Sequence, residues 1–291
     1  MSHPRPLVSI VTPSYNQARF LEDLLHSIQA QTYPRLEHLV IDGGSTDGTA
    51  DVLRRAGGRV SYWVSEPDEG QAHAVQKGFE RAKGAIVAWI NADDVYFSPS
   101  ALSDVVDAFH RHPHAGAIYG DAALINAQGA VVRVLPALSG LSLNRLAAYC
   151  PVQPSIFVRG ELAARFPVRR GLRYGLDYEC WLRMCRGGVR FHYLPKLLTG
   201  FRIHGASKTA MDQRGILKEL SAIKAEYFGR SWRVRWPAEP MVRRSQAVWL
   251  RMRGFTRFPE VYRTSLAFRG TRPEPLRFCL QQLTSRTLQE A

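Results

Sequence analysis

The chain lacks the features that would place it in a membrane or in a disulfide-bonded secreted class. None of its apolar runs approaches the roughly 18 residues of a membrane-spanning helix, and residues 1–6 lead into a strand-like run without a signal-peptide pattern. The four cysteines show no CxxC spacing, which disfavours a thiolate metal site and fits a reducing compartment. Because 45% of its residues are hydrophobic, the chain can bury a full core. We therefore expect a cytoplasmic protein.

Two common phosphate-binding loops are also missing. No GxGxxG follows the first strand-like run, and no GxxxxGK followed by Ser or Thr occurs anywhere in the chain. The usual dinucleotide and P-loop cradles are therefore excluded, and a bound phosphate would need a metal ion instead.

Acidic residues are scarce toward the C-terminus. Residues 214–291 hold 16 of the 39 Lys and Arg but only 6 of the 25 acids, so they carry +10, against +4 for residues 1–213. Aromatic residues such as Trp232, Trp236 and Trp249 lie among these arginines. The mixture suits an anionic membrane surface, and equally a small helical subdomain kept soluble by its arginines. Nucleic acid would attract the same charge but is not favoured. We expect two parts, residues 1–213 and a basic, helical extension over 214–291.

The first 115 residues alternate between strand-like runs and helical periodicity, which predicts an α/β fold with a parallel sheet. The strand-like runs span residues 7–12, 36–41, 60–64 and 85–90. After about residue 115, short strands and a hairpin with a turn at residues 127–129 predict that the sheet becomes mixed.

Polar residues follow each of the four runs, which predicts one crevice at the carboxyl edge of the sheet. Asp42 follows the second run, Asp68 the third, and Asp93 with Asp94 the fourth. Adjacent carboxylates repel each other unless a cation or a donor-rich ligand lies between them, so the pair suggests a divalent metal. The alternative is a solvated turn that caps the next helix. With Tyr15 as a stacking surface, this edge would suit a nucleoside diphosphate conjugate.

Five segments of the chain carry motifs in a recognisable order. They read VSIVTPSYN at residues 8–16, IDGGSTDGT at 41–49, SEPDEGQ at 65–71, NADD at 91–94 and LDYECWLR at 176–183. These segments resemble the motifs of the family 2 inverting glycosyltransferases, over about residues 7–210. The resemblance implies a GT-A fold, which is a Rossmann-like mixed sheet flanked by helices. It also implies a nucleotide-diphosphate sugar donor, foremost a UDP-sugar, and a glycan or lipid-linked acceptor in polysaccharide biosynthesis. Such acceptors reside at the inner face of the cell membrane, where the basic extension would hold the protein.

The same resemblance implies roles for the motif residues. Asp94 would bind Mg²⁺ or Mn²⁺, and Asp93 would contact the ribose or the donor sugar. The nucleoside pocket would be lined by Pro13, Tyr15, Asp42 and Asp68. Many family members carry a second acid where this chain has Gly43, so contact with the base could fall to Asp68.

Asp177 matches the family's general base, which must deprotonate the acceptor hydroxyl in a single inverting displacement. Its alternative role is that of a helix N-cap. Residues 201–209 resemble a late family motif in which His204 would complete the metal shell and Arg202 or Lys208 would offset phosphate charge. A structural histidine is the alternative for His204.

Two other functions compete with a hexosyltransferase of this kind. A sugar-1-phosphate nucleotidyltransferase would need a Gly-rich entry loop with a lysine, which the sequence lacks. A non-catalytic nucleotide-binding or glycan-binding module would use Asp177 only as a cap, and product formation would distinguish it from an enzyme.

Overall fold

The alternating runs of the N-terminal half form a parallel sheet. A computed structural model of the protein describes residues 5–229. Its first four strands lie in the order β3-β2-β1-β4 and pair in parallel. They are β1 (Val8–Ser14), β2 (Leu36–Asp42), β3 (Tyr62–Ser65) and β4 (Ile86–Trp89). The prediction of parallel βα units is thus confirmed, with each strand within two residues of its expected bounds.

The second half of the sheet is mixed, as predicted. The strand β8 (Ile156–Arg159) joins the two halves, since it is antiparallel to both β4 and β6. The two short runs expected near residues 117–125 form one strand, β6 (Ala117–Ile125), which makes the predicted hairpin with β7 (Val131–Leu135). The long strand β9 (Phe191–Arg202) is parallel to β6 and antiparallel to the short β5 (Val95–Tyr96).

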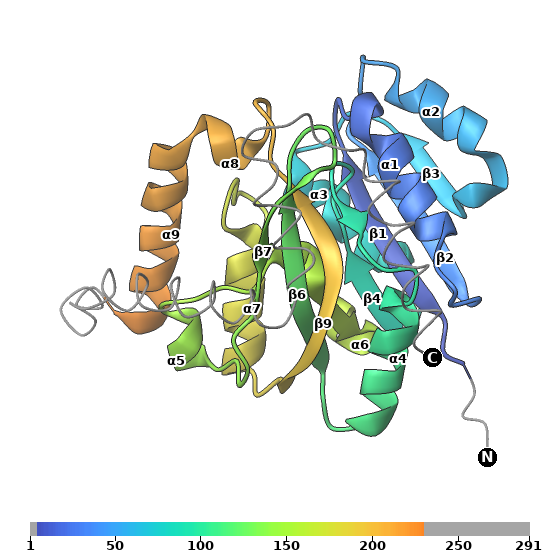
Figure 1. Ribbon diagram of the computed structural model, residues 1–291. Coiled ribbons are helices and arrows are strands. Elements are labelled where there is room, and N and C mark those ends of the chain that lie inside the picture. Colours follow the sequence, from blue (N-terminus) through green and yellow to red (C-terminus); the bar gives the residue numbers. More distant parts are fainter. Residues whose placement is uncertain (1–4, 230–291) are drawn as a thin grey trace.

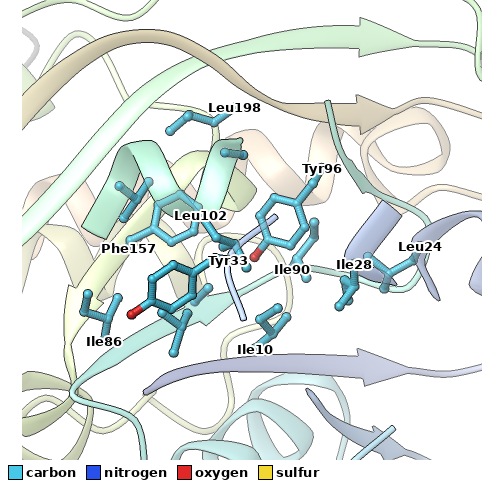
Figure 2. Packing of buried hydrophobic residues seen from close by; sticks show 14 of the residues in the cluster. Ile10, Leu24, Ile28, Tyr33, Ile86, Ile90, Tyr96, Leu102, Phe157 and Leu198 are labelled. Carbon is cyan, nitrogen blue, oxygen red and sulfur yellow. The ribbon is translucent and has the colours of Figure 1, made fainter. Parts of the chain in front are cut away.

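Helices cover both faces of this sheet (Figure 1). One face buries apolar residues of α1 (Ala18–Gln29), α2 (Thr49–Ala56) and α4 (Ala101–Arg111) against Ile10, Val40 and Ala88. Figure 2 shows part of this core, where Leu102 lies beside Phe157 and Ile28 lies between Ile90 and Leu24. The other face packs against α3 (Gln71–Arg81), α6 (Gly160–Arg165) and α7 (Leu176–Arg186). The short helix α5 (Leu143–Leu146) lies beside α7.

The chain after β9 folds back along α7. It forms α8 (Lys208–Met211) and α9 (Gln213–Phe228), and Ile223 of α9 is buried in the same core as α7. The predicted boundary after residue 213 falls at the first residue of α9, a helix whose Ile223 is buried against the main core. The tryptophans of the basic extension lie outside residues 5–229. Within those residues, no helix combines the length and the apolar character needed to traverse a bilayer.

Candidate functional site

Asp42 and Asp68 lie together at the carboxyl ends of β2 and β3. The Asp42 carboxylate is fully buried and accepts hydrogen bonds from Ser45 N at 2.9 Å and Ser65 Oγ at 2.6 Å. Asp68 accepts one from Gly70 N at 2.7 Å. A Cβ atom on Gly43 would lie 2.9 Å from Asp68 Oδ2. The glycine after Asp42 therefore leaves room for the Asp68 carboxylate, which stands where a side chain of residue 43 would be.

Tyr15 and Pro13 lie at the same edge but in different environments. Pro13 is buried within β1, opposite Ile41, whereas the Tyr15 side chain is exposed, with 63% of its surface accessible. The next residue, Asn16, has a left-handed φ of 53°, and its backbone N–H donates to Ser45 Oγ at 2.7 Å. This turn fixes Tyr15 as an open aromatic surface beside the Asp42 loop.

The two carboxylates after β4 have opposite environments. Asp94 is buried, with 1% of its surface exposed, and its oxygens accept hydrogen bonds from Arg202 N at 2.9 Å and Asn91 Nδ2 at 3.2 Å. Burial and the neighbouring Asp93 raise the pKa of Asp94 well above its usual range. Asp93 is partly exposed and faces His204, whose Nε2 lies 3.1 Å from Asp93 Oδ2. The geometry thus makes Asp93, rather than Asp94, the carboxylate available to a ligand.

Arg202, the expected phosphate contact, points into the protein. Its side chain has no exposed surface. The Nε atom donates to Asp93 O at 2.7 Å, and Nη2 pairs with Asp23 Oδ2 at 2.9 Å. The remaining nitrogen donates to Ala127 O at 3.1 Å, and the guanidinium lies 4.9 Å from the ring of Phe20. Because every nitrogen of the group has a protein acceptor, Arg202 braces the turn that carries Asp93.

An amide network connects this turn to a lysine. Asn91 Oδ1 accepts a hydrogen bond from Gln71 Nε2 at 2.7 Å, and Gln71 Oε1 accepts one from Lys208 Nζ at 2.9 Å. The carboxylates of Asp68 and Asp93 both act on the Lys208 ammonium electrostatically. Burial and the neighbouring Arg173 lower the pKa of Lys208, while both predicted donor carboxylates lie within electrostatic reach of its ammonium group. Neither Gln71 nor Asn91 was predicted as a site residue, although both lie within the motifs at residues 65–71 and 91–94.

Asp177 lies in the first turn of α7 and is partly buried. Burial raises its pKa to about 6, although the backbone N–H groups of Asp177 and Tyr178 oppose that shift. The N-cap of the helix is Gly175, so Asp177 does not occupy the cap position itself. The preceding loop approaches the donor edge, since Arg170 Nη1 lies 3.5 Å from Glu69 Oε2. Asp93, Asp94, Arg202 and His204 contact one another directly, and Asp177 lies outside this set of contacts.

The comparisons with known proteins agree with this fold. Residues 9–122 match the family model described as glycosyl transferase family 2. The chain belongs to this family of glycosyltransferases. An uncharacterised glycosyltransferase of Rickettsia felis is 32% identical over 212 residues, which are 68% of this chain and 34% of that relative. TuaG of Bacillus subtilis, whose assignment to teichuronic acid biosynthesis is itself provisional, is 40% identical over 97 residues, 32% of this chain and 38% of TuaG. The chain thus spans little more than a third of the length of these two curated relatives.

Solved structures identify the fold of this glycosyltransferase as GT-A. The Staphylococcus aureus protein TarS, residues 1–349 in complex with UDP-GlcNAc, superposes with a TM-score of 0.61 at 18% identity. The match covers 76% of this chain and 66% of that one. The mannosyltransferase PcManGT of Pyrobaculum calidifontis, in complex with GDP-Man and Mn²⁺, gives a TM-score of 0.53 at 21% identity over 98% of this chain and 81% of that one.

The residues of this glycosyltransferase fit a metal site that the substrate completes. Within residues 5–229, no three or more His, Cys, Asp or Glu side chains are grouped as metal ligands. Asp93 and His204, however, offer one carboxylate and one imidazole side by side. Mg²⁺ is commonly held by one or two carboxylates together with substrate phosphates and water. A nucleoside diphosphate could supply the ligands that the protein does not.

Proposed function

We propose that the protein is a metal-dependent, inverting glycosyltransferase that moves a sugar from a nucleoside diphosphate sugar to a glycan or lipid-linked acceptor. The observation that carries this proposal is the Asp93–His204 pair at 3.1 Å, which lies at the carboxyl edge of the sheet. Lys208, connected through Gln71 and Asn91, supplies positive charge beside the pair. A carboxylate, an imidazole and an ammonium group in this order suit a diphosphate with a divalent cation.

We assign the donor contacts from the exposure of each side chain. Asp93 and His204 would hold Mg²⁺ or Mn²⁺, which would offset the charge on the departing nucleoside diphosphate. This assignment moves the metal from Asp94 to Asp93, because the Asp94 oxygens already accept bonds from Arg202 N and Asn91. Arg202 would act only through the backbone of Asp93. Of the two residues expected to contact phosphate, Lys208 would therefore do so, because the Arg202 guanidinium is already paired within the protein.

The nucleoside would lie on the exposed ring of Tyr15, with the Asp68 carboxylate free to accept hydrogen bonds from its base or ribose. Asp42 would support the pocket without contacting the nucleoside, since its carboxylate is buried and accepts hydrogen bonds from Ser45 and Ser65. TarS was solved with UDP-GlcNAc and PcManGT with GDP-Man, which supports a nucleotide sugar as donor. A UDP-sugar remains our first expectation.

Asp177 would act as the general base for the acceptor hydroxyl. A carboxylate whose pKa is about 6 is deprotonated at neutral pH and is a stronger base than an ordinary aspartate. A direct attack assisted by this base inverts the anomeric centre. A hexose as the transferred group is part of the same proposal.

The acceptor and the location are inferred from TuaG and from the basic extension. The printed name of TuaG links that protein to teichuronic acid biosynthesis, which supports polysaccharide biosynthesis as the process. We expect the protein in the cytoplasm, held at the inner membrane face by residues 214–291, whose net charge is +10. Removal of residues 230–291 should then abolish sedimentation with vesicles that contain anionic lipid, and unchanged sedimentation would refute the membrane role.

The test of the donor site is nucleotide binding with and without Mn²⁺. The unfolding temperature should rise with UDP or GDP only when Mn²⁺ is present, because the metal would bind together with the diphosphate. A ligand at 100 times its Kd stabilises the native state by about 2.7 kcal/mol. Asp93→Asn should remove the Mn²⁺-dependent shift, whereas Asp94→Asn should keep it. No Mn²⁺-dependent shift with either nucleotide in the wild type would refute the proposal. Release of nucleotide from UDP-GlcNAc or GDP-mannose, lost in Asp177→Asn, would distinguish an enzyme from a binding module.

A further inference from the structure

Three backbone amides just before Asp177 share one carboxylate from another helix. Glu219 of α9 accepts hydrogen bonds from Arg173 N at 2.9 Å, Tyr174 N at 2.7 Å and Gly175 N at 2.7 Å. These three residues form the end of the loop that leads into α7, and the third is the N-cap of that helix. A charge-assisted hydrogen bond to a backbone N–H is stronger than one between neutral groups. The Glu219 carboxylate therefore fixes the backbone two residues before Asp177.

The contact between α9 and this loop is close along its length. A Cβ atom on Gly175 would lie 2.7 Å from Ile223 Cδ1 and 3.0 Å from Leu220 Cδ2. Gly175 has no positive φ, so the glycine serves this close approach rather than an unusual backbone conformation. The neighbouring Tyr174 donates its hydroxyl to Asp212 Oδ2 at 2.5 Å, at the N-cap of α9. Both the amides and the side chain of the loop are thus held by the same helix.

The segment that holds the loop also touches the donor side. Residues 202–208 bring His204 to Asp93 at 3.1 Å and Lys208 to Gln71 at 2.9 Å, and α9 follows within five residues of Lys208. One continuous stretch, residues 202–228, therefore contacts the donor carboxylate at its start and the loop before Asp177 further along. Sequence reasoning gave no role to Glu219, because nothing within residues 213–228 resembled a motif.

We propose that Glu219 is a positioning residue that orients Asp177 for proton abstraction from the acceptor. This inference rests on the proposed function of Asp177. Both Glu219 oxygens accept hydrogen bonds from backbone amides. By fixing the amides of residues 173–175, Glu219 determines where the first turn of α7 points its carboxylate. Loss of a fixed near-attack geometry slows a reaction without weakening the binding of the donor, so Glu219 should affect kcat rather than donor KM.

The test compares three variants of the full chain. Glu219→Ala removes all three acceptor contacts, whereas Glu219→Gln keeps a carbonyl oxygen for the two amides bonded to Oε1, those of Tyr174 and Gly175. Glu226→Ala is the matched control, since it removes another carboxylate of the same helix. The Glu226 carboxylate pairs with Arg169 of the same loop at 2.8 Å, in an exposed ion pair. The assay is nucleotide release from UDP-GlcNAc and from GDP-mannose with Mn²⁺, together with amide hydrogen exchange of residues 173–175.

We expect Glu219→Ala to lower kcat at least 30-fold with donor KM within threefold, and to speed exchange of the three amides. Glu219→Gln should retain at least a fifth of the wild-type kcat, and Glu226→Ala should keep kcat within twofold. The inference fails if Glu219→Ala stays within threefold of the wild-type kcat while Asp177→Asn is inactive. It also fails if Glu219→Gln is as slow as Glu219→Ala, because the amide contacts would then not be what matters. Full activity of Asp177→Asn would instead overturn the proposed function itself.

Discussion

Replacing Arg202 by methionine distinguishes a structural guanidinium from a phosphate-binding one. Methionine fills much of the same volume but leaves three sites without their donor, namely the Asp93 carbonyl, the adjacent carbonyls of Asn126 and Ala127, and the Asp23 carboxylate. Breaking a buried charged pair by removing one partner typically costs 3–5 kcal/mol. Asp23 keeps 45% of its side-chain surface exposed and can be hydrated again, so we expect the lower end, about 3 kcal/mol.

Urea unfolding followed by far-UV circular dichroism measures this loss directly. Arg202→Lys should lose about half as much, since a single ammonium group keeps the charge but cannot reach all three acceptors. In titration calorimetry at a temperature where the variant is folded, Arg202→Lys should bind UDP in the presence of Mn²⁺ with a Kd within fivefold of the wild-type value. The reasoning is refuted if Arg202→Met is as stable as the wild type within 1 kcal/mol but binds UDP more than tenfold more weakly, because the guanidinium would then serve the donor.

Four further measurements test the candidate site. Nucleotide release should fall about tenfold for each pH unit below 6, since only the ionised Asp177 accepts a proton; a flat profile between pH 5 and 7 would contradict this role. Because the pKa of Asp177 is raised in the folded state, its ionisation costs folding stability, and this stability is lost as pH rises through 6. Asp177→Asn should therefore melt at a higher temperature than the wild type at pH 8. The difference should shrink toward pH 4.5. Gly43→Ala should weaken UDP binding about tenfold by displacing Asp68, with the melting temperature almost unchanged, and calorimetry that finds an unaltered Kd would exclude a role for Asp68. Tyr15→Ala should weaken UDP binding by roughly 1–2 kcal/mol if the ring stacks on the base. A Kd equal to that of the wild type would rule out stacking.

The elements that were predicted correctly are those specified by local sequence. The strands β1 to β4 and the β6–β7 hairpin follow from apolar runs and turn residues within a few positions of each other. Strand β8 escaped prediction because it has only four residues and its partners, β4 and β6, lie far from it in the chain. The length of β9 likewise depends on its pairing with β6 and β5, which no local pattern encodes.

The candidate site residues could be identified from the sequence, but the individual role of each residue could not. Asp93 and Asp94 are neighbours with the same chemistry, and only the fold determines which of them points inward to meet Arg202 N. Arg202 is buried because Asp23, 179 positions earlier, and two carbonyls near residue 127 supply its partners. Glu219 acts on a loop 44 to 46 positions away. Such contacts between distant segments arise only once the sheet is closed.

The junction at β8 has a consequence for the order in which the protein forms during synthesis. The strands β3, β2, β1 and β4 are complete by residue 89, and their pairing needs nothing that follows. The outer edge of β4 is sealed only by β8, at residues 156–159. During translation at about 5–20 residues per second, this edge therefore stays open for several seconds. An open edge of a parallel sheet is a template for pairing with another chain, so the β4 edge exposes the nascent protein to such pairing until β8 has been made.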